Sequence, residues 1–308
     1  MPVRRREFRH SLPPVLLTIM LIFAPLISFA LSSTALSDTK LLETGRAANA
    51  ETKAPAGTPD EIKVVTYNMR WRGGEDLRKL IKLLKEDAEI GKAAVVGLQE
   101  VDRDKKRTGN ANTARLMAEE LGMHYAWAAP AQARGKELAE EETGVALLSQ
   151  YPMTDVKRIV LPHEGPGGRR RVALGATIHI GPKSLRVYSV HAETRTSNEK
   201  RIEQFKAVLE DLQAHATLKH SIVLGDFNTI TGKDVNHTSR LFTDNGFHTP
   251  FSNDEATWKT FIIELKLDWL WLRGFDVKAY GIDKKITLSD HWPMWTVVRM
   301  KDEKQAAR

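Results

Sequence analysis

Short apolar runs alternate with amphipathic helical patterns from residue 62 to residue 300, and this alternation constrains the fold more than any other feature. Residues 77–88 place apolar side chains at i, i+3, i+4 and i+7, the spacing of a helix with one buried face. Strand-like runs separated by few helices predict an α/β domain of packed mixed sheets with helices outside. The predicted helices are 77–88, 113–121 and 202–212, the last opened by a capping box at Thr196-x-x-Glu199, and the predicted strands are 63–67, 93–98, 125–128, 145–148, 172–180, 185–190, 222–224, 267–272, 277–280 and 294–300.

The amino-terminal 37 residues have the layout of an export signal. Arg4-Arg5-Arg6 precedes an apolar run over residues 15–31, which small residues suited to cleavage follow. The alternative is a membrane anchor, but 17 residues that include Pro25 are near the short limit for a membrane span. We therefore expect residues 1–37 to be a signal peptide, or a membrane anchor through residues 15–31 if uncleaved, and the protein to be periplasmic or secreted.

Residues 38–60 are rich in Ala, Thr, Gly and Pro and show no apolar period, so they are predicted to be a linker. A single domain is then expected over residues 61–301, followed by a polar tail over residues 302–308. The formal charge of +7 includes +3 from residues 1–37, and the remaining +4 is mildly basic and compatible with anionic substrates. The chain has no cysteine, which excludes disulfides, thiolate metal sites and cysteine nucleophiles.

Several of the apolar runs end in a carboxylate, an amide or an imidazole. Ile222-Val223-Leu224, for example, leads into Gly225-Asp226-Phe227-Asn228. Gly, Asp and Asn are also the usual turn formers, so each motif taken alone is more simply explained as a turn at a strand end. Their joint presence in one chain indicates a shared site. The strand-end polar residues are Tyr67-Asn68, Gln99-Glu100, His191, Asp226, Asn228, Asp268 and Ser289-Asp290-His291.

Taken together, these residues are suited to displacement at a phosphate ester. Glu100 and Asp290 offer hard oxygen ligands that suit Mg²⁺, with Mn²⁺ as the alternative ion. A histidine paired with a carboxylate is suited to proton transfer, because the carboxylate fixes the tautomer and stabilises the charged ring. Asp226 would then orient or deprotonate a water, and Asn228 would hold that carboxylate or a phosphate oxygen. The set predicts metal-assisted attack of water at phosphorus.

In order and spacing, the strand-end residues resemble the endonuclease/exonuclease/phosphatase superfamily over roughly residues 62–300. The resemblance implies a four-layer α/β sandwich, in which two packed mixed β-sheets carry helices on their outer faces and the site lies at one sheet edge. The matching motifs are Gly225-Asp226-Phe227-Asn228, Ser289-Asp290-His291, Gly144–Ser149 with Tyr151-Pro152, and Arg201-x-x-Gln204.

The resemblance also implies a metal site. Glu100 would be the principal Mg²⁺ ligand, with Asn68 nearby and Asp290 as a further carboxylate on the metal side. After Asn68 the chain reads Met69-Arg70-Trp71, where some branches of the superfamily place a carboxylate near Arg70. This departure gives little support for a second metal ligand on that segment.

The remaining strand-end residues take catalytic roles by the same resemblance. Asp226 would position or activate the attacking water, and Asn228 would support it and the phosphate. His291 would contact the scissile phosphate and be oriented by Asp268. His191 occupies a position that is histidine in the deoxyribonuclease-like and sphingomyelinase-like branches, whereas the abasic-site endonuclease branch usually has tyrosine there. Both this histidine and the expected export argue against a DNA-repair enzyme.

The sequence indicates the substrate less clearly than it indicates the reaction. Basic loops over residues 102–107 and 165–171 flank the expected site and could neutralise phosphates, although a merely solvated loop is an equal alternative. Trp71 and Trp292 could stack bases or meet lipid, although core packing is the commoner fate of tryptophan. No long apolar hairpin is visible in the sequence. Three hypotheses follow: an exported Mg²⁺-dependent phosphodiesterase acting on nucleic acid, which is favoured; the same chemistry on a phospholipid or another phosphate ester; and a non-catalytic binding protein on the same scaffold.

Overall fold

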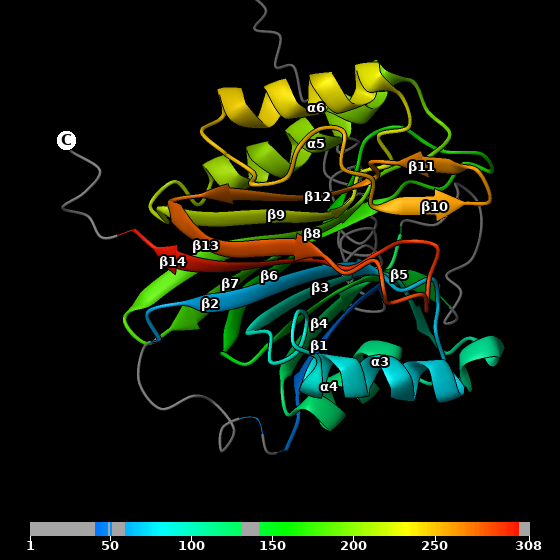
Figure 1. Ribbon diagram of the computed structural model, residues 1–308, viewed down its shortest axis with the longest axis vertical. Coiled ribbons are helices and arrows are strands. Elements are labelled where there is room, and N and C mark those ends of the chain that lie inside the picture. The colour runs from blue at the N-terminus through cyan, green and yellow to red at the C-terminus, as the bar shows by residue number, and fades with distance from the viewer. Residues whose placement is uncertain (1–40, 49, 51–58, 131–141, 302–308) are drawn as a thin grey trace, which may run out of the picture. The chain divides into compact units, whose positions relative to one another are not determined.

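The computed structural model describes residues 41–48, 50, 59–130 and 142–301. These residues form two packed β-sheets whose outer faces are covered by helices, so the expected four-layer α/β sandwich is confirmed (Figure 1). The expectations for residues 1–37 and 302–308 lie outside the described residues. Within the described part of the chain, no helix is long and apolar enough to cross a membrane.

The larger sheet has seven strands, the smaller has five, and a separate hairpin has two. In spatial order the larger sheet contains β1 (Leu42–Arg46), β4 (His124–Ala128), β5 (Glu142–Ser149), β3 (Val95–Arg103), β2 (Ile62–Asn68), β14 (Met294–Met300) and β13 (Phe275–Ile282). The smaller sheet contains β12 (Asp268–Arg273), β9 (His220–Asp226), β8 (Lys183–His191), β7 (Val172–Ile180) and β6 (Met153–Val160), and the hairpin contains β10 (Trp258–Thr260) and β11 (Ile263–Leu265).

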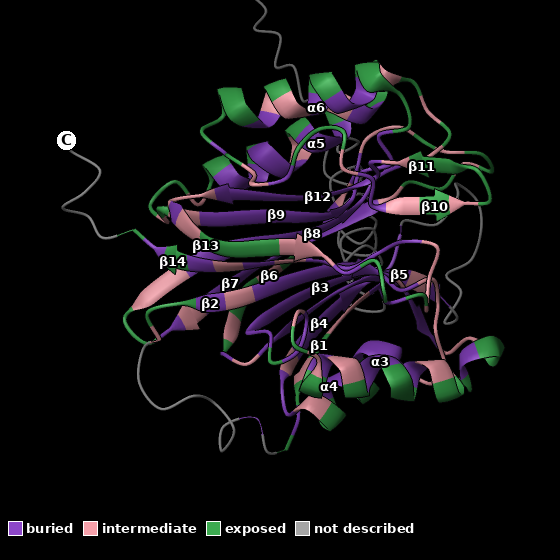
Figure 2. Cartoon of the chain, in the orientation of Figure 1, coloured by how far each residue is buried: buried purple, intermediate pink, exposed green. Residues whose placement is uncertain are grey.

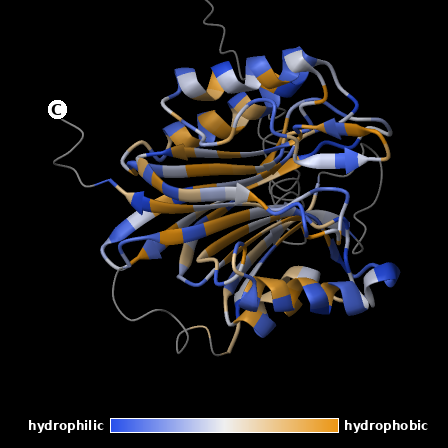
Figure 3. Cartoon of the chain, in the orientation of Figure 1, coloured by the Kyte–Doolittle hydropathy of each residue, from blue (hydrophilic) through white to orange (hydrophobic). Residues whose placement is uncertain are grey.

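Four α-helices of the described residues flank the sheets. Helices α3 (Gly74–Glu86) and α4 (Thr113–Leu121) share an apolar cluster with one face of the larger sheet. Helices α5 (Asn198–Gln213) and α6 (Gly232–Asp244) do the same with the smaller sheet. A third cluster fills the space between the two sheets, where the strands are buried and apolar (Figures 2 and 3). A short 3₁₀ helix, Lys106–Thr108, completes the described elements.

The strand directions bring the expected site to one edge of the sandwich. Strand β2 runs parallel to β3, and β8 runs parallel to β9, so the carboxyl ends of these strands point the same way within each sheet. Strands β14 and β12 are antiparallel to β2 and β9, which places their amino ends beside those carboxyl ends. A hydrogen bond from Asn68 on β2 to Asp226 on β9 joins the two sheets at this edge.

The structure corrects two sequence-based expectations and adds one helix. The linker expected over residues 38–60 is wrong for Leu42–Arg46, which pair with β4 as an edge strand too short and polar to show an apolar period. The capping box expected at Thr196 is also wrong, because Ser197 is the N-cap of α5 and accepts from the Lys200 backbone N–H. A capping box is present instead at Thr231, at the start of α6, a helix that the sequence pattern did not indicate.

Candidate active site

Asp226 is the centre of a cluster of polar side chains at the shared edge. Its Oδ2 atom accepts a hydrogen bond of 3.0 Å from Asn68 Nδ2. The same oxygen lies 3.6 Å from His191 Nε2 and 3.8 Å from His291 Nε2. All four residues are buried. One carboxylate oxygen is thus surrounded by nitrogens from β2, from β8 and from the segment before β14.

The backbone around Asp226 explains the glycine and asparagine on either side of it. Gly225 has φ +133°, and a Cβ there would lie 2.1 Å from the carbonyl oxygen of Val190 on the neighbouring strand. Asn228 has φ +51°, and its backbone N–H donates to Asp226 Oδ1 at 3.0 Å. Its side-chain amide donates to the Ala192 carbonyl at 3.0 Å. The turn expected from Gly-Asp-x-Asn is therefore present, and it also fixes the direction of the carboxylate.

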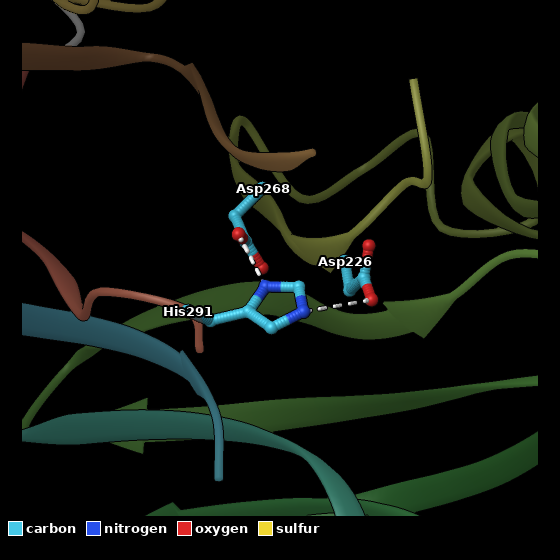
Figure 4. A group of neighbouring side chains, drawn as sticks. All are labelled: Asp226, Asp268 and His291. Carbon is cyan, nitrogen blue, oxygen red and sulfur yellow. Dashed lines mark hydrogen bonds and ion pairs between the residues drawn. The ribbon is translucent and has the colours of Figure 1, made fainter. Parts of the chain in front are cut away.

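His291 is held between two carboxylates (Figure 4). Its Nδ1 atom lies 2.8 Å from Asp268 Oδ2, and its Nε2 atom faces Asp226. Burial alone would lower the pKa of His291, but the charges of Asp268 and Asp226 outweigh it and raise the pKa to about 9. The ring is therefore an imidazolium at neutral pH, donating from Nδ1 to Asp268. Burial, with a contribution from the nearby Asp268, raises the pKa of Asp226 to about 7.

His191 has the opposite charge state. Burial lowers its pKa well below the usual value, and the positive charges of Arg171 and His291 lower it further. Arg171 Nη1 lies 3.5 Å from His191 Nδ1, and because a guanidinium can only donate, Nδ1 must be the acceptor. The remaining hydrogen of the neutral ring then sits on Nε2, the atom that faces Asp226.

Glu100 reaches the same edge through an irregularity in β3. The pairing of β3 with β5 shifts register between Gln99 and Val101, and Glu100 between them has φ +55°. Such a bulge re-aims one side chain without ending the strand. Asn68 Nδ2 lies 3.3 Å from Glu100 Oε1, so Asn68 bridges Glu100 and Asp226. Glu100 was expected to close its strand, but β3 continues to Arg103.

Asp290 lies partly exposed beside these residues. It forms an ion pair of 3.1 Å with Arg70 Nη1, and its Oδ1 accepts from Ser289 Oγ at 3.2 Å. Arg70 and Trp71 have φ +47° and +48°, a conformation that bulky residues rarely adopt. A guanidinium cannot ligate a cation, so Arg70 cannot be a metal ligand. This agrees with the sequence, which gives little support for a second metal ligand on this segment.

Two sets of the described residues could hold a metal ion. Asp226, Asp268 and His291 have ligand atoms within 4.8 Å of one another. His291 Nδ1 is already engaged by Asp268 at 2.8 Å, so this set is better suited to handling protons. Glu100, Asn68 and Asp290 carry the oxygen atoms that suit a hard cation. Among the described residues only Asn68 hydrogen-bonds to the Glu100 carboxylate, whereas Asn68 Oδ1 accepts from the Arg70 backbone N–H at 3.1 Å and Asp290 pairs with Arg70. Glu100, Asn68 and Asp290 are the residues that would hold Mg²⁺.

A pocket of about 550 Å³ opens beside Glu100 and His191. Its walls are strongly basic, with five arginines against two glutamates. A hollow of about 600 Å³ between α3 and residues 283–288 contains none of the strand-end polar groups and is set apart from this chemistry. The residues lining the basic pocket are Trp71, Glu100, Arg107, Pro130, Thr143, Pro166, Arg169, Arg170, Arg171, His191, Glu193, Thr194 and Arg195.

Sequence reasoning missed the segment that follows His191. Glu193 and Arg195 line the pocket, yet neither belongs to a recognisable motif. Two buried polar residues of α5 hold this segment: Gln204 Oε1 accepts from the Glu193 backbone N–H at 2.9 Å, and Arg201 Nε donates to the Glu193 carbonyl at 3.3 Å. Polar residues at buried positions of an amphipathic helix were the available signal.

All eight residues expected at the site lie at this edge of the sandwich. Direct contacts connect Asn68, Glu100, His191, Asp226, Asn228, Asp268 and His291, and Asp290 precedes His291 in the chain. Of the basic loops, the one at residues 165–171 supplies four pocket residues, whereas the loop at 102–107 supplies only Arg107. Trp71 also lines the pocket, while Trp292 is buried.

Comparison with known proteins agrees with this architecture. The sequence model of the Endonuclease/Exonuclease/phosphatase family matches residues 65–291. An endonuclease/exonuclease/phosphatase from Beutenbergia cavernae DSM 12333 is similar with a TM-score of 0.60 and 20% identity, over 79% of this chain and 72% of that chain. The human Nocturnin catalytic domain, solved with a bound sulfate anion, has a TM-score of 0.60 and 17% identity over 79% and 94% of the two chains. D. rerio TDP2, humanized by 14 mutations, has a TM-score of 0.59 and 18% identity, over 79% of this chain and 100% of that chain. At these identities the similar structures show a common fold. A search of curated proteins found no match.

Proposed function

Because the chain belongs to the endonuclease/exonuclease/phosphatase family, we propose that it is an exported Mg²⁺-dependent phosphodiesterase that hydrolyses nucleic acid by attack of water at phosphorus. The observation that carries this proposal is the environment of Asp226, where Asn68, His191 and His291 direct nitrogens at one carboxylate oxygen. A protein that only binds phosphate gains nothing from a buried carboxylate at the anion site, because like charges repel. A hydrolase needs such a group to take a proton from water.

The side chains of the site divide the chemistry among them. Mg²⁺, when bound by Glu100, Asn68 and Asp290, would supply charge neutralisation and polarisation of a phosphate oxygen. Asp226, with its pKa raised by burial to about 7, accepts a proton from the attacking water. Asn68 and the Asn228 backbone N–H hold the carboxylate in one orientation.

The two histidines act in different charge states. His291, kept protonated by its carboxylate neighbours, places a positive charge where the phosphate oxygens gain charge in the transition state. Asp268 orients that ring through its 2.8 Å contact to Nδ1. His191, which is neutral, directs an N–H toward Asp226 and so steadies the carboxylate without adding charge.

Nucleic acid is favoured as the substrate because of the basic pocket. Five arginines line it, and arginine neutralises backbone phosphates and recognises them with two parallel hydrogen bonds. The bound sulfate of the Nocturnin catalytic domain supports an oxyanion site on this scaffold, because sulfate has the tetrahedral shape and charge of phosphate.

A phospholipid is the second candidate, and one structural feature favours it. Phe261 and Ile262, at the tip of the β10–β11 hairpin, are 100% and 93% exposed. The hairpin is attached to the site, because Lys259 N–H donates to the Asp290 carbonyl at 2.9 Å and Trp258 pairs with His291. The sequence did not indicate this apolar hairpin. A solvent-exposed Phe-Ile pair next to a catalytic edge is typical of a surface that meets lipid.

Export is part of the proposal and rests on the sequence alone. The triple arginine at residues 4–6, followed by the apolar run over residues 15–31, supports it. Fractionation of cells that express the full chain would test it: recovery of the protein in the cytosolic fraction, with residues 1–37 retained, contradicts export.

The proposed activity is tested with the full chain and a panel of esters, assayed with Mg²⁺ and with EDTA. The panel contains single-stranded DNA, RNA, sphingomyelin, phosphoinositides and bis(p-nitrophenyl) phosphate. Metal-dependent cleavage of DNA or RNA supports the nucleic-acid assignment, and cleavage confined to lipids supports the second candidate. Absence of turnover on every ester supports a binding protein.

A matched pair of variants separates enzyme from binding protein. Glu100→Gln removes one negative charge from the oxygen donors at nearly constant shape, so an enzyme should lose nearly all turnover. Glu210→Gln makes the same change at an exposed position on α5 and should have no effect. A Glu100→Gln variant with wild-type turnover contradicts the proposed function.

A further inference from the structure

We propose that the basic pocket binds a second phosphate group of the substrate, beyond the one that is hydrolysed, through Arg170 and Arg195. The proposal rests on the phosphodiesterase function proposed above and narrows its substrate class. Both arginines line the pocket of about 550 Å³ that also contains Glu100 and His191, so the pocket is continuous with the catalytic edge. A ligand that enters it extends away from the scissile bond without leaving the protein surface.

Three of the five pocket arginines are already paired with carboxylates. Arg107 binds Asp102 with two hydrogen bonds, of 2.7 and 2.9 Å. Arg171 Nε donates to Glu193 Oε2 at 3.2 Å, and Arg169 pairs with Glu142. These arginines shape the walls, but their charges are largely compensated.

Among the described residues, Arg170 and Arg195 have no such partner. Both side chains are exposed, and no carboxylate of the described residues forms an ion pair with either of them. They approach the pocket from different segments, the loop before β7 and the loop after β8. Two uncompensated guanidinium groups on the rim of one pocket favour an anion there, and each can donate two parallel hydrogen bonds to phosphate oxygens.

The part of the pocket wall formed by Trp71, Arg107 and Thr143 is held in place by several contacts. The guanidinium of Arg107 lies 4.2 Å from the centre of the Trp71 ring, and its pairing with Asp102 fixes it there. Thr143 Oγ1 also bonds to Asp102, at 2.6 Å. A wall held in this way loses little conformational freedom when a ligand binds, which favours affinity.

The charge of the pocket also discriminates among phosphate esters. A phosphocholine headgroup would place a quaternary ammonium near two uncompensated arginines, and this contact is repulsive. A simple aryl phosphodiester has no second anionic group to offer. The shared chemistry of the expected substrates is therefore a second phosphate, supplied either by the next link of a polynucleotide or by a nucleotide polyphosphate.

The test compares two substrates that differ by one phosphate link: the dinucleotide TpT and the trinucleotide TpTpT. We expect the wild type to favour TpTpT in kcat/KM by about tenfold to a hundredfold, the range for one or two charge-assisted hydrogen bonds. The Arg170→Ala/Arg195→Ala double variant should lose most of this preference. Arg240→Ala, on the exposed side of α6, removes an arginine remote from the pocket and should keep the preference.

A binding experiment in EDTA gives a readout that does not depend on turnover. Fluorescence anisotropy with a labelled thymidine oligonucleotide should show a Kd about tenfold to a hundredfold weaker for the double variant, and a smaller slope of log Kd against log salt concentration. Lysine at both positions should restore part of the affinity. A dinucleoside pyrophosphate in the same assays distinguishes the sources: tighter binding than the oligonucleotide indicates a nucleotide polyphosphate, and weaker binding a polynucleotide.

The outcomes separate this proposal from the one on which it rests. If the wild type cleaves both TpT and TpTpT and the double variant retains its preference for TpTpT, the second-phosphate site is overturned. The proposed phosphodiesterase function is then unaffected. A wild type that cleaves no ester but binds the oligonucleotide through Arg170 and Arg195 overturns the proposed function and supports the anion site. Equal oligonucleotide affinity of the wild type and the double variant overturns the site in either case.

Discussion

Asp226 and Asp268 are direct cross-strand partners on β9 and β12, so the fold holds two buried carboxylates side by side. The His291 ring lies between them, 2.8 Å from Asp268 Oδ2 and 3.8 Å from Asp226 Oδ2. Two like charges at this separation are unfavourable in a buried site, and the imidazolium offsets their repulsion. The arrangement gives Asp268 a different role from Asp226, because Asp268 holds the ring and Asp226 faces the substrate edge.

Asp268→Ala should therefore lower kcat by a factor of about 10² to 10⁴, because the His291 ring loses both its orientation and the charge that keeps it protonated. Asp268→Asn keeps a hydrogen-bonding group without the charge, so its kcat should lie between that of Asp268→Ala and that of the wild type. The measurement is hydrolysis of bis(p-nitrophenyl) phosphate, with circular dichroism to confirm folding. A folded Asp268→Ala variant within tenfold of the wild type would remove Asp268 from the mechanism.

Gly225→Ala should destabilise the protein by at least about 2 kcal/mol, because φ +133° is unfavourable for alanine and its Cβ would clash with the Val190 carbonyl at 2.1 Å. Gly232→Ala is the matched control, since a Cβ at that first residue of α6 meets nothing within 4 Å. Urea unfolding of both variants measures the difference. Equal free energies of unfolding for Gly225→Ala and the wild type would contradict the strain argument.

Lys266 gives the free energy of unfolding a pH dependence with a defined sign. Its ammonium is buried over the rings of Trp269 and Phe251, and burial lowers its pKa from 10.5 to about 8. Between these values the unfolded chain binds more protons than the folded protein, so this group makes stability rise with pH in that window and contributes no slope below about pH 8. From pH 7 to pH 9.5 the gain is roughly 2 kcal/mol.

Lys266→Met isolates this contribution. The variant keeps the length of the side chain and removes the charge, so the difference in unfolding free energy between wild type and variant should shrink between pH 7 and 9.5, while effects of tyrosine ionisation cancel. A difference in unfolding free energy that stays constant with pH would show that burial does not lower the pKa of Lys266 in the folded protein.

The second candidate function, with a phospholipid substrate, predicts that the hairpin tip binds membranes. Phe261 and Ile262 each contribute about 1.5 to 3 kcal/mol if they become fully buried in a bilayer interface. Phe261→Ser/Ile262→Ser should therefore weaken binding to phosphatidylglycerol vesicles by at least about tenfold in a sedimentation assay. Leu116→Ser, at a half-exposed position on α4, is the control and should have no effect. Unchanged vesicle binding of the hairpin variant would exclude this tip as a lipid contact.

Much of the fold follows from local patterns in the sequence. Helix α3 has four buried apolar residues at regular spacing, and central strands contain short apolar runs such as residues 95–98 and 222–224, so both were predictable. The missed elements lack such patterns. Strand β6 (Met153–Val160) lies at a sheet edge and four of its eight residues are polar, while α6 buries only four of its thirteen residues.

The gathering of the expected site residues at one edge was predictable from their places at strand ends, but several of their contacts were not. Asn68 and Asp226 are 158 residues apart in the chain, and only the packing of the two sheets makes them hydrogen-bonded partners. The bulge at Glu100 and the left-handed pair Arg70-Trp71 are local conformations that no apolar period encodes. The ion pair of Arg70 with Asp290 joins two segments that are far apart in the chain, and it was equally inaccessible to sequence reasoning.

The central claim is that Asp226 takes the proton from water during metal-dependent hydrolysis. The most direct measurement is kcat of Asp226→Asn on bis(p-nitrophenyl) phosphate at saturating Mg²⁺, beside the wild type with Mg²⁺ and with EDTA. We predict that the wild type loses turnover in EDTA and recovers it with Mg²⁺, and that folded Asp226→Asn is slower by at least about 10³-fold, because an amide cannot accept the proton. A folded Asp226→Asn variant within tenfold of the wild type would contradict the account.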